Sequence, residues 1–107
     1  MKTLESSQQD EWVNVLKAMA DETRLRLLRS LFVEPQSVNH LAERLDISQY
    51  NVSKHLRILR ESGLVTSVKQ GKQRVYSLGS SLHTRLVENE NILDLGCCAF
   101  RFDQLPE

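Results

Sequence analysis

The chain has 107 residues, of which 40% are apolar, and its acidic and basic side chains balance to a formal net charge of zero. This length fits one domain with a thin core, and so small a fold leaves apolar surface that dimerisation can cover. No apolar run approaches the ~20 residues that a membrane span needs, and the first residues lack the apolar stretch of a signal peptide. We therefore expect a cytoplasmic protein with reduced thiols and no membrane partner.

The first third of the chain predicts two helices. The first covers residues 9–19, and Asp21 is a favourable N-cap for a second helix. This second helix must end before Pro35, because the residue before a proline is pushed out of the α region. The apolar residues recur at helical spacing, with Trp12, Val15, Leu16 and Met19 in the first helix and Leu25, Leu28, Leu31 and Phe32 in the second.

Two short helices follow, separated by a tight turn at Asp46 and Ile47. Ser37 is placed to cap the first of them and Ser48 the second, and Gly63 is expected just past the C-terminus of the second. Their inward residues are Val38, Leu41 and Leu45, then Val52, Leu56 and Leu59. Two helices with so short a connection predict a helix-turn-helix.

The rest of the chain predicts a β-hairpin and a last helix. β-rich segments lie on either side of Gln70-Gly71-Lys72, which favours strand, turn and strand. The last helix is expected over Ser81–Leu95, capped by Ser80 or Ser81. Its apolar residues are Leu82, Leu86, Ile92, Leu93 and Leu95. The predicted fold is mainly α with a small β-hairpin, a single winged helix-turn-helix domain over residues 1–107. The apolar stripes of the first and last helices are expected to pair two copies as a homodimer.

Charge is concentrated around the fourth predicted helix and the hairpin. Between Ser53 and Arg74 there are six basic residues and one acid, which gives +5 within a neutral chain. Such asymmetry is what phosphate binding requires, although a solvated helix face is the alternative. Amides and basic side chains can also pair with base edges in the major groove. The predicted DNA contacts are Ser48, Gln49, Tyr50, Asn51, Ser53, Lys54, Arg57, Lys69, Lys72 and Arg74. The expected partner is double-stranded operator DNA, and the lack of a nucleophile–base set argues against an enzyme.

Three segments, ADETRLRLLRSL, SVNHLAERLDISQYNVSKHLRILRESGLV and RVYSL, resemble the ArsR/SmtB family of small bacterial metalloregulators. The resemblance spans roughly residues 12–80. It implies a homodimeric winged-helix repressor that leaves its operator when an inducer binds, with no permanent cofactor. It also implies that the first and last helices form the dimer interface. Ser48–Glu61 would be the recognition helix and Lys69–Arg74 the wing tip.

The family's best-known ligand positions are not filled in this sequence. Its zinc-type site would begin near Ser80 and Leu82, where His83 lies one residue away and no later histidine follows. Its thiol-rich arsenic site would fall at residues that are not soft ligands, namely Ser37, Asn39 and Ala42. The resemblance therefore covers the DNA-binding frame better than the sensor.

The two cysteines of the chain, Cys97 and Cys98, are adjacent. Soft thiolates suit a thiophilic ion, and two of them would satisfy a monosubstituted trivalent arsenical or antimonial. A partner subunit could also supply a third thiolate. Some family members place adjacent cysteines after the last helix, so the resemblance favours such an inducer. Two alternatives stay open: a thiol-redox or reactive-sulfur switch, and packing residues in a regulator without a ligand.

Overall fold

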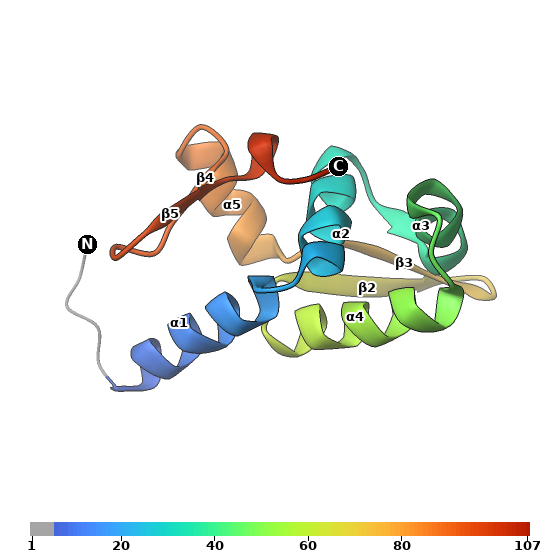
Figure 1. The fold of residues 1–107 in the computed structure, drawn as a ribbon, viewed down its shortest axis with the longest axis horizontal. Helices are drawn as coiled ribbons and strands as arrows, with labels where there is room; N and C mark the ends of the chain where they lie inside the picture. The colour runs from blue at the N-terminus through green and yellow to red at the C-terminus, as the bar shows by residue number, and fades with distance from the viewer. Residues whose placement is uncertain (1–5) are drawn as a thin grey trace.

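The computed structural model describes residues 6–107, with side-chain environments from Val13 onward, so Trp12 lies outside the described side chains. Figure 1 shows the arrangement of the elements. In chain order they are α1 (Ser6–Met19), α2 (Glu22–Val33), β1 (Gln36–Ser37), α3 (Val38–Leu45), α4 (Gln49–Glu61), β2 (Val65–Gln70), β3 (Gln73–Leu78), α5 (Ser80–Glu88), β4 (Ile92–Asp94), β5 (Ala99–Arg101) and a 3-10 turn, η1 (Phe102–Gln104). No helix in the described part of the chain is long and apolar enough to cross a bilayer.

Three of the four predicted N-caps are confirmed. The side chains of Asp21, Ser37 and Ser48 each accept a backbone N–H from three residues further on, at 3.0, 3.2 and 3.1 Å. These bonds satisfy N–H groups that have no partner within the first turn of a helix. Gly63 follows α4 with φ of +83°, in the left-handed region that glycine adopts without a steric penalty. The helix-turn-helix is thus fixed largely by local interactions.

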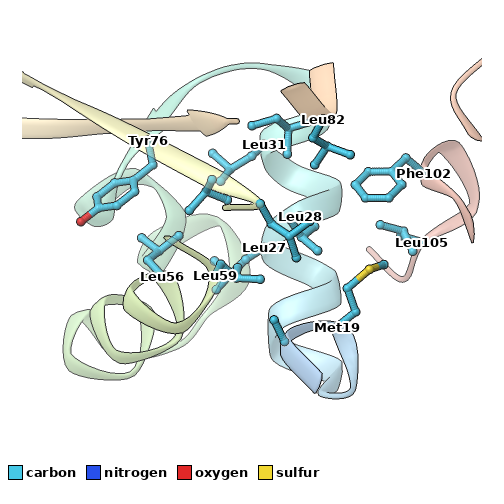
Figure 2. Packing of buried hydrophobic residues seen from close by; sticks show 14 of the residues in the cluster. Met19, Leu27, Leu28, Leu31, Leu56, Leu59, Tyr76, Leu82, Phe102 and Leu105 are labelled. Carbon is cyan, nitrogen blue, oxygen red and sulfur yellow. The ribbon is translucent and has the colours of Figure 1, made fainter. Parts of the chain in front are cut away.

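α2 lies at the centre of the hydrophobic core. Leu27 and Leu28 are fully buried, and Figure 2 shows Leu27 on the side of α2 that faces α4. On the other side of α2, Phe102 and Leu105 of the C-terminal segment cover the helix (Figure 2). Burial of this kind is the main favourable contribution to folding. α2 therefore packs against both the helix-turn-helix and the C-terminal segment, and connects them within one core.

The predicted hairpin is confirmed, and a third strand extends it. β2 and β3 pair antiparallel from Val65 opposite Leu78 to Gln70 opposite Gln73. The short β1, which the sequence did not predict, pairs with the other edge of β3 and gives the order β1-β3-β2. This hairpin is the wing. Its tip lies at the same end of the molecule as the start of α4 (Figure 1).

At the base of the wing, the backbones of Gly63 and Gly79 are in direct contact. A Cβ atom on Gly79 would lie 2.5 Å from the carbonyl oxygen of Gly63, a distance that carbon atoms do not tolerate. The Gly79 N–H donates to the carbonyl of Leu64 at 2.9 Å in the same place. The end of α4 and the start of α5 are therefore held together by direct backbone contact.

The prediction for the last helix is wrong at both ends. α5 ends at Glu88 instead of Leu95, because Glu90 and Asn91 adopt positive φ angles of 53° and 69°. Residues in that left-handed region cannot continue a right-handed helix. Its N-cap is Gly79, without a side-chain cap bond, so neither Ser80 nor Ser81 caps the helix.

The residues expected to finish this helix form a second hairpin instead. β4 and β5 pair antiparallel, with Ile92 opposite Arg101 and Asp94 opposite Ala99. Leu93 and Leu95 are both buried, so the apolar residues follow the two-residue period of a strand. Much of the apolar stripe expected at a dimer interface is therefore buried within one chain.

Two arginines of α2 hold the segment after β5. Arg29 donates to the carbonyl oxygen of Asp103 and, at 3.2 Å, to the carboxylate of Glu107. Arg26 donates to the carbonyl of Glu107 and to that of Leu45 at the end of α3, both at 3.1 Å. The C-terminal segment is thus fixed to the same helix that supports the helix-turn-helix.

Candidate DNA interface and thiol pair

α4 presents a continuous polar face to solvent. The inward residues Val52, Leu56 and Leu59 are fully buried. All ten side chains predicted to contact DNA are exposed, on α4 and its N-cap or on the wing: Ser48, Gln49, Tyr50, Asn51, Ser53, Lys54, Arg57, Lys69, Lys72 and Arg74. The structure thus brings the predicted contacts together on the accessible side of the helix-turn-helix and its wing.

Most of these side chains are free to contact a ligand. Tyr50 is 77% exposed, so most of its ring is accessible to a ligand. Arg57 forms an ion pair with Glu61 at 2.9 Å, but both groups are well exposed, and such surface pairs contribute little stability. A phosphate can therefore compete for Arg57 at small cost. The Ser48 hydroxyl differs, because it already caps α4.

The wing places cations directly opposite one another. Lys69 on β2 pairs in register with Arg74 on β3, and like charges in this position are destabilising. Arg74 donates one hydrogen bond to the Ser67 hydroxyl, at 3.2 Å. Lys72 lies in the turn itself and is exposed. An anion beside the wing would relieve this repulsion, as a DNA phosphate would do.

Cys97 and Cys98 lie at the tip of the β4–β5 hairpin. Gly96 has φ of +89° and occupies the first position of the two-residue turn, where glycine is preferred. Its N–H donates to the Asp94 carboxylate at 2.7 Å, and the Leu95 N–H closes the turn by donating to the Cys98 carbonyl at 2.9 Å. The turn holds the two sulfur atoms 3.3 Å apart as free thiols.

The two thiols differ in their surroundings. Cys97 is exposed, whereas Cys98 is half-buried against the core. The pKa of the Cys97 thiol is raised above its ordinary value, first by desolvation at the turn and then by the hydrogen bond and the electrostatic interaction with Cys98. Cys97 is therefore mainly a protonated thiol at neutral pH, and a bound ion would have to displace its proton.

Within the described residues, no group of three or more His, Cys, Asp or Glu side chains could hold a metal ion. Ser37 is used as the cap of α3, and His83 on α5 is exposed. Within the described part of this chain, Cys97 and Cys98 therefore have no third side chain of these types beside them.

Comparison with known proteins supports the helix-turn-helix. Residues 19–68 match a family model described as a helix-turn-helix domain. The chain is 41% identical over 76 residues to the transcriptional activator HlyU of Vibrio cholerae, an alignment that covers 71% of this chain and 70% of HlyU. It is 43% identical over 67 residues to the arsenical resistance operon repressor of Escherichia coli, covering 62% of this chain and 57% of that repressor.

Solved structures agree with the fold. An ArsR-like transcriptional regulator from Rhodococcus sp. RHA1 superimposes with a TM-score of 0.68 at 34% identity, covering 77% of each chain. Reduced HlyU from Vibrio cholerae superimposes with a TM-score of 0.66 at 38% identity, covering 77% of this chain and 86% of that one. The predictions of a winged helix-turn-helix and of a regulator rather than an enzyme are confirmed. This chain belongs to the ArsR/SmtB family of DNA-binding, winged helix-turn-helix transcriptional regulators.

Proposed function

We propose that this regulator binds operator DNA through α4 and the wing and is released when a thiophilic ligand binds Cys97 and Cys98. The observation that carries the sensor assignment is the separation of 3.3 Å between two sulfur atoms at the tip of a short hairpin. The ligand class is a trivalent arsenical or antimonial. The names of the relatives include both an activator and a repressor, and we propose repression for this chain.

The sulfur separation favours a pyramidal ion over a tetrahedral one. With the ~2.3 Å metal–sulfur distance of thiolate ligands, two sulfurs 3.3 Å apart subtend an angle of about 92° at a shared ion. Trivalent arsenic and antimony form three bonds at nearly right angles, whereas zinc prefers the wider tetrahedral angle with four ligands. The pair as it stands is therefore better suited to arsenic or antimony.

The number of ligands selects the form of the inducer. Because no third His, Cys, Asp or Glu side chain joins the pair within the described residues, the chain offers two bonds. A monosubstituted trivalent arsenical needs only two, since its third bond is already made to carbon. Inorganic arsenite would need a third thiolate from the partner subunit.

A thiol-redox or reactive-sulfur switch is the second candidate, and the relative described as reduced HlyU favours it. Against it, the pKa of the Cys97 thiol is raised, and oxidation depends on the thiolate. The sulfurs are also adjacent in sequence at the tip of a tight turn, where a disulfide between neighbours would be strained. Oxidation would therefore favour an intersubunit or mixed disulfide.

The first test uses the purified protein bound to an operator duplex selected from random DNA. We expect phenylarsine oxide to weaken operator binding by roughly 5–150-fold, the usual range for an effector. Cys97→Ser, Cys98→Ser and the double variant should keep operator affinity but no longer respond. Arsenite, zinc and a mild oxidant are run in parallel.

The outcomes separate the three hypotheses. Release of the thiol-free double variant by phenylarsine oxide would place the site elsewhere. A wild type that ignores arsenicals but leaves DNA on oxidation or persulfide treatment would establish the redox alternative. If neither treatment releases DNA, the two cysteines are packing residues.

We also propose that the protein acts as a homodimer through α1 and α5. α1 extends from the body in Figure 1, and Val13 on its surface is exposed although Ala18 and Met19 at its end are buried. Val87 on α5 is 70% exposed beside a hollow of about 590 Å³ between α2 and α5. Apolar side chains of this size are covered when a second copy packs against them.

Analytical ultracentrifugation at micromolar concentration tests the assembly. The wild type should sediment as a dimer, and Val87→Glu should shift it toward monomer because a charge would be buried at the interface. The matched control is Val68→Glu, since Val68 is also exposed but lies on the wing. A wild type that remains monomeric would exclude the proposed dimer.

A further inference from the structure

Arg24 connects the end of α1 to α2. Its Nε donates to the carbonyl of Ala18 at 2.6 Å, and one terminal nitrogen donates to the carbonyl of Lys17 at 3.3 Å. The last carbonyls of a helix have no partner within the helix. The Lys17 carbonyl also accepts the backbone N–H of Ala20, at 3.3 Å, so Arg24 adds a second bond there and supplies a donor to Ala18. The Arg24 side chain is only 14% exposed. The Arg24 guanidinium therefore caps the C-terminal end of α1 and fixes the direction of α1 relative to α2.

The same guanidinium reaches the recognition helix. Its other terminal nitrogen lies 3.2 Å from Nδ1 of His55 on α4. A guanidinium can only donate, so Nδ1 of His55 is the acceptor in this contact. The His55 side chain is 17% exposed and faces α2, although its neighbour Lys54 is exposed on the outer face.

Asp21 completes the cluster. Its carboxylate lies 4.0 Å from both the Arg24 guanidinium and His55 Nδ1. The pKa of Asp21 is lowered, chiefly by the backbone N–H of Arg24 and, after the opposing effect of burial, by the charge of Arg24. The carboxylate stays charged and holds the guanidinium in place.

The fully buried side chains of α4 are apolar. Val52, Leu56 and Leu59 bury one stripe, and hydrophobic contact is not directional, so it sets the rotation of a helix only loosely. A hydrogen bond from a planar cation fixes both distance and direction. His55 lies between Lys54 and Arg57, two predicted DNA contacts. The hydrogen bond between Arg24 and His55 therefore limits the rotation of α4 about its own axis, and so determines which side chains face the DNA major groove.

We propose that Arg24 is a positioning residue for DNA binding, which orients α4 relative to α1 through the Nδ1 atom of His55. The Arg24 side chain points toward the end of α1 and the start of α2, and not toward the surface that would face the DNA. If α1 forms the proposed dimer interface, the same contact also sets the spacing of the two recognition helices. The effect on a single α4 does not depend on that dimer.

The test compares operator and random-sequence affinity for four variants. Arg24→Lys keeps the charge but cannot reach three partners, and His55→Phe removes the acceptor. Each should lower operator affinity by about tenfold, in keeping with the loss of one hydrogen bond to a charged group, with a smaller loss on random DNA. The double variant should be no weaker than either single one. His55→Asn, whose side-chain oxygen replaces Nδ1 as acceptor, should bind within about twofold of the wild type.

Several results would overturn the proposal. Wild-type operator affinity in Arg24→Lys would show that only the charge matters. Equal losses for His55→Asn and His55→Phe would show that packing matters and not the acceptor. Losses that multiply in the double variant, or that are equal on operator and random DNA, would mean that the two residues do not act together in orienting α4. Circular dichroism at the assay temperature confirms that each variant is folded, and the two His55 variants keep the test decisive if Arg24→Lys unfolds.

Discussion

Replacing Phe102 with alanine should lower the free energy of unfolding by about 3–5 kcal/mol, the usual cost of removing a large buried aromatic side chain. Phe102 is completely buried, and its ring meets that of Phe32 edge-on, with centroids 6.4 Å apart and planes at 63°. Such pairs contribute energy beyond the area that they bury. Urea unfolding followed by far-UV circular dichroism measures the change.

Phe100→Ala is the matched control for this experiment. Phe100 lies two residues earlier on β5 and is only half-buried, so its loss should cost clearly less. If the two substitutions cost the same, the C-terminal segment does not contribute to the core in solution as it does in the structure.

Replacing Gln49 with alanine should relax sequence preference at one base position, and replacing Lys72 should weaken binding to all sequences alike. Gln49 is exposed in the first turn of α4, and a bidentate amide–adenine contact is worth roughly 1–3 kcal/mol of discrimination. Lys72 lies in the wing turn, where removal of one phosphate contact should make the dependence of log affinity on log salt shallower by ~1. Binding titrations on operator and random duplexes at several salt concentrations measure both effects.

Lys17→Ala serves as the control for charge, because Lys17 is an exposed lysine on α1 rather than on the wing. Its loss should leave the salt dependence almost unchanged. Equal losses for Gln49→Ala on operator and random DNA would assign Gln49 to backbone contact. A salt dependence unchanged by Lys72→Ala would remove the wing turn from the interface.

The helix-turn-helix could be predicted from the sequence because its signals are local. Asp21, Ser37 and Ser48 cap helices through bonds that reach only three residues, and each begins an amphipathic stripe. Gly63 and Gly71 mark the end of α4 and the turn of the wing, and both adopt positive φ. Interactions of this range depend on neighbouring residues and leave a pattern in the sequence.

The end of α5 could not be placed with the same certainty, because an apolar pattern can fit two periods. Leu93 and Leu95 extend a helical stripe that begins at Leu82, but their alternation is also that of a strand. Two features near them favoured the hairpin. One is the polar run Asn89-Glu90-Asn91, whose last two residues adopt positive φ, and the other is Gly96 in the second turn. Together they were a better guide than the spacing of the leucines.

The contacts of Arg24 and His55 are different, since no local pattern reveals them. They are 31 residues apart in the sequence, and each has the residue type of an ordinary surface position on a helix. Only the packing of α4 across α2 brings them together. The thiol pair lies between these cases: the adjacent cysteines are evident in the sequence, but the 3.3 Å separation depends on the turn.

The anchoring of the C-terminal segment on α2 has a consequence for the order in which the protein is made. Arg29 and its partner Asp103 are separated by 74 residues, so α2 leaves the ribosome long before the segment that covers it is synthesised. Until then the surface of α2 that receives Phe102 and Leu105 is open to water, next to a helix-turn-helix whose own elements are already complete. At that stage the nascent chain exposes the apolar face of α2, and chaperone binding or aggregation would compete with folding.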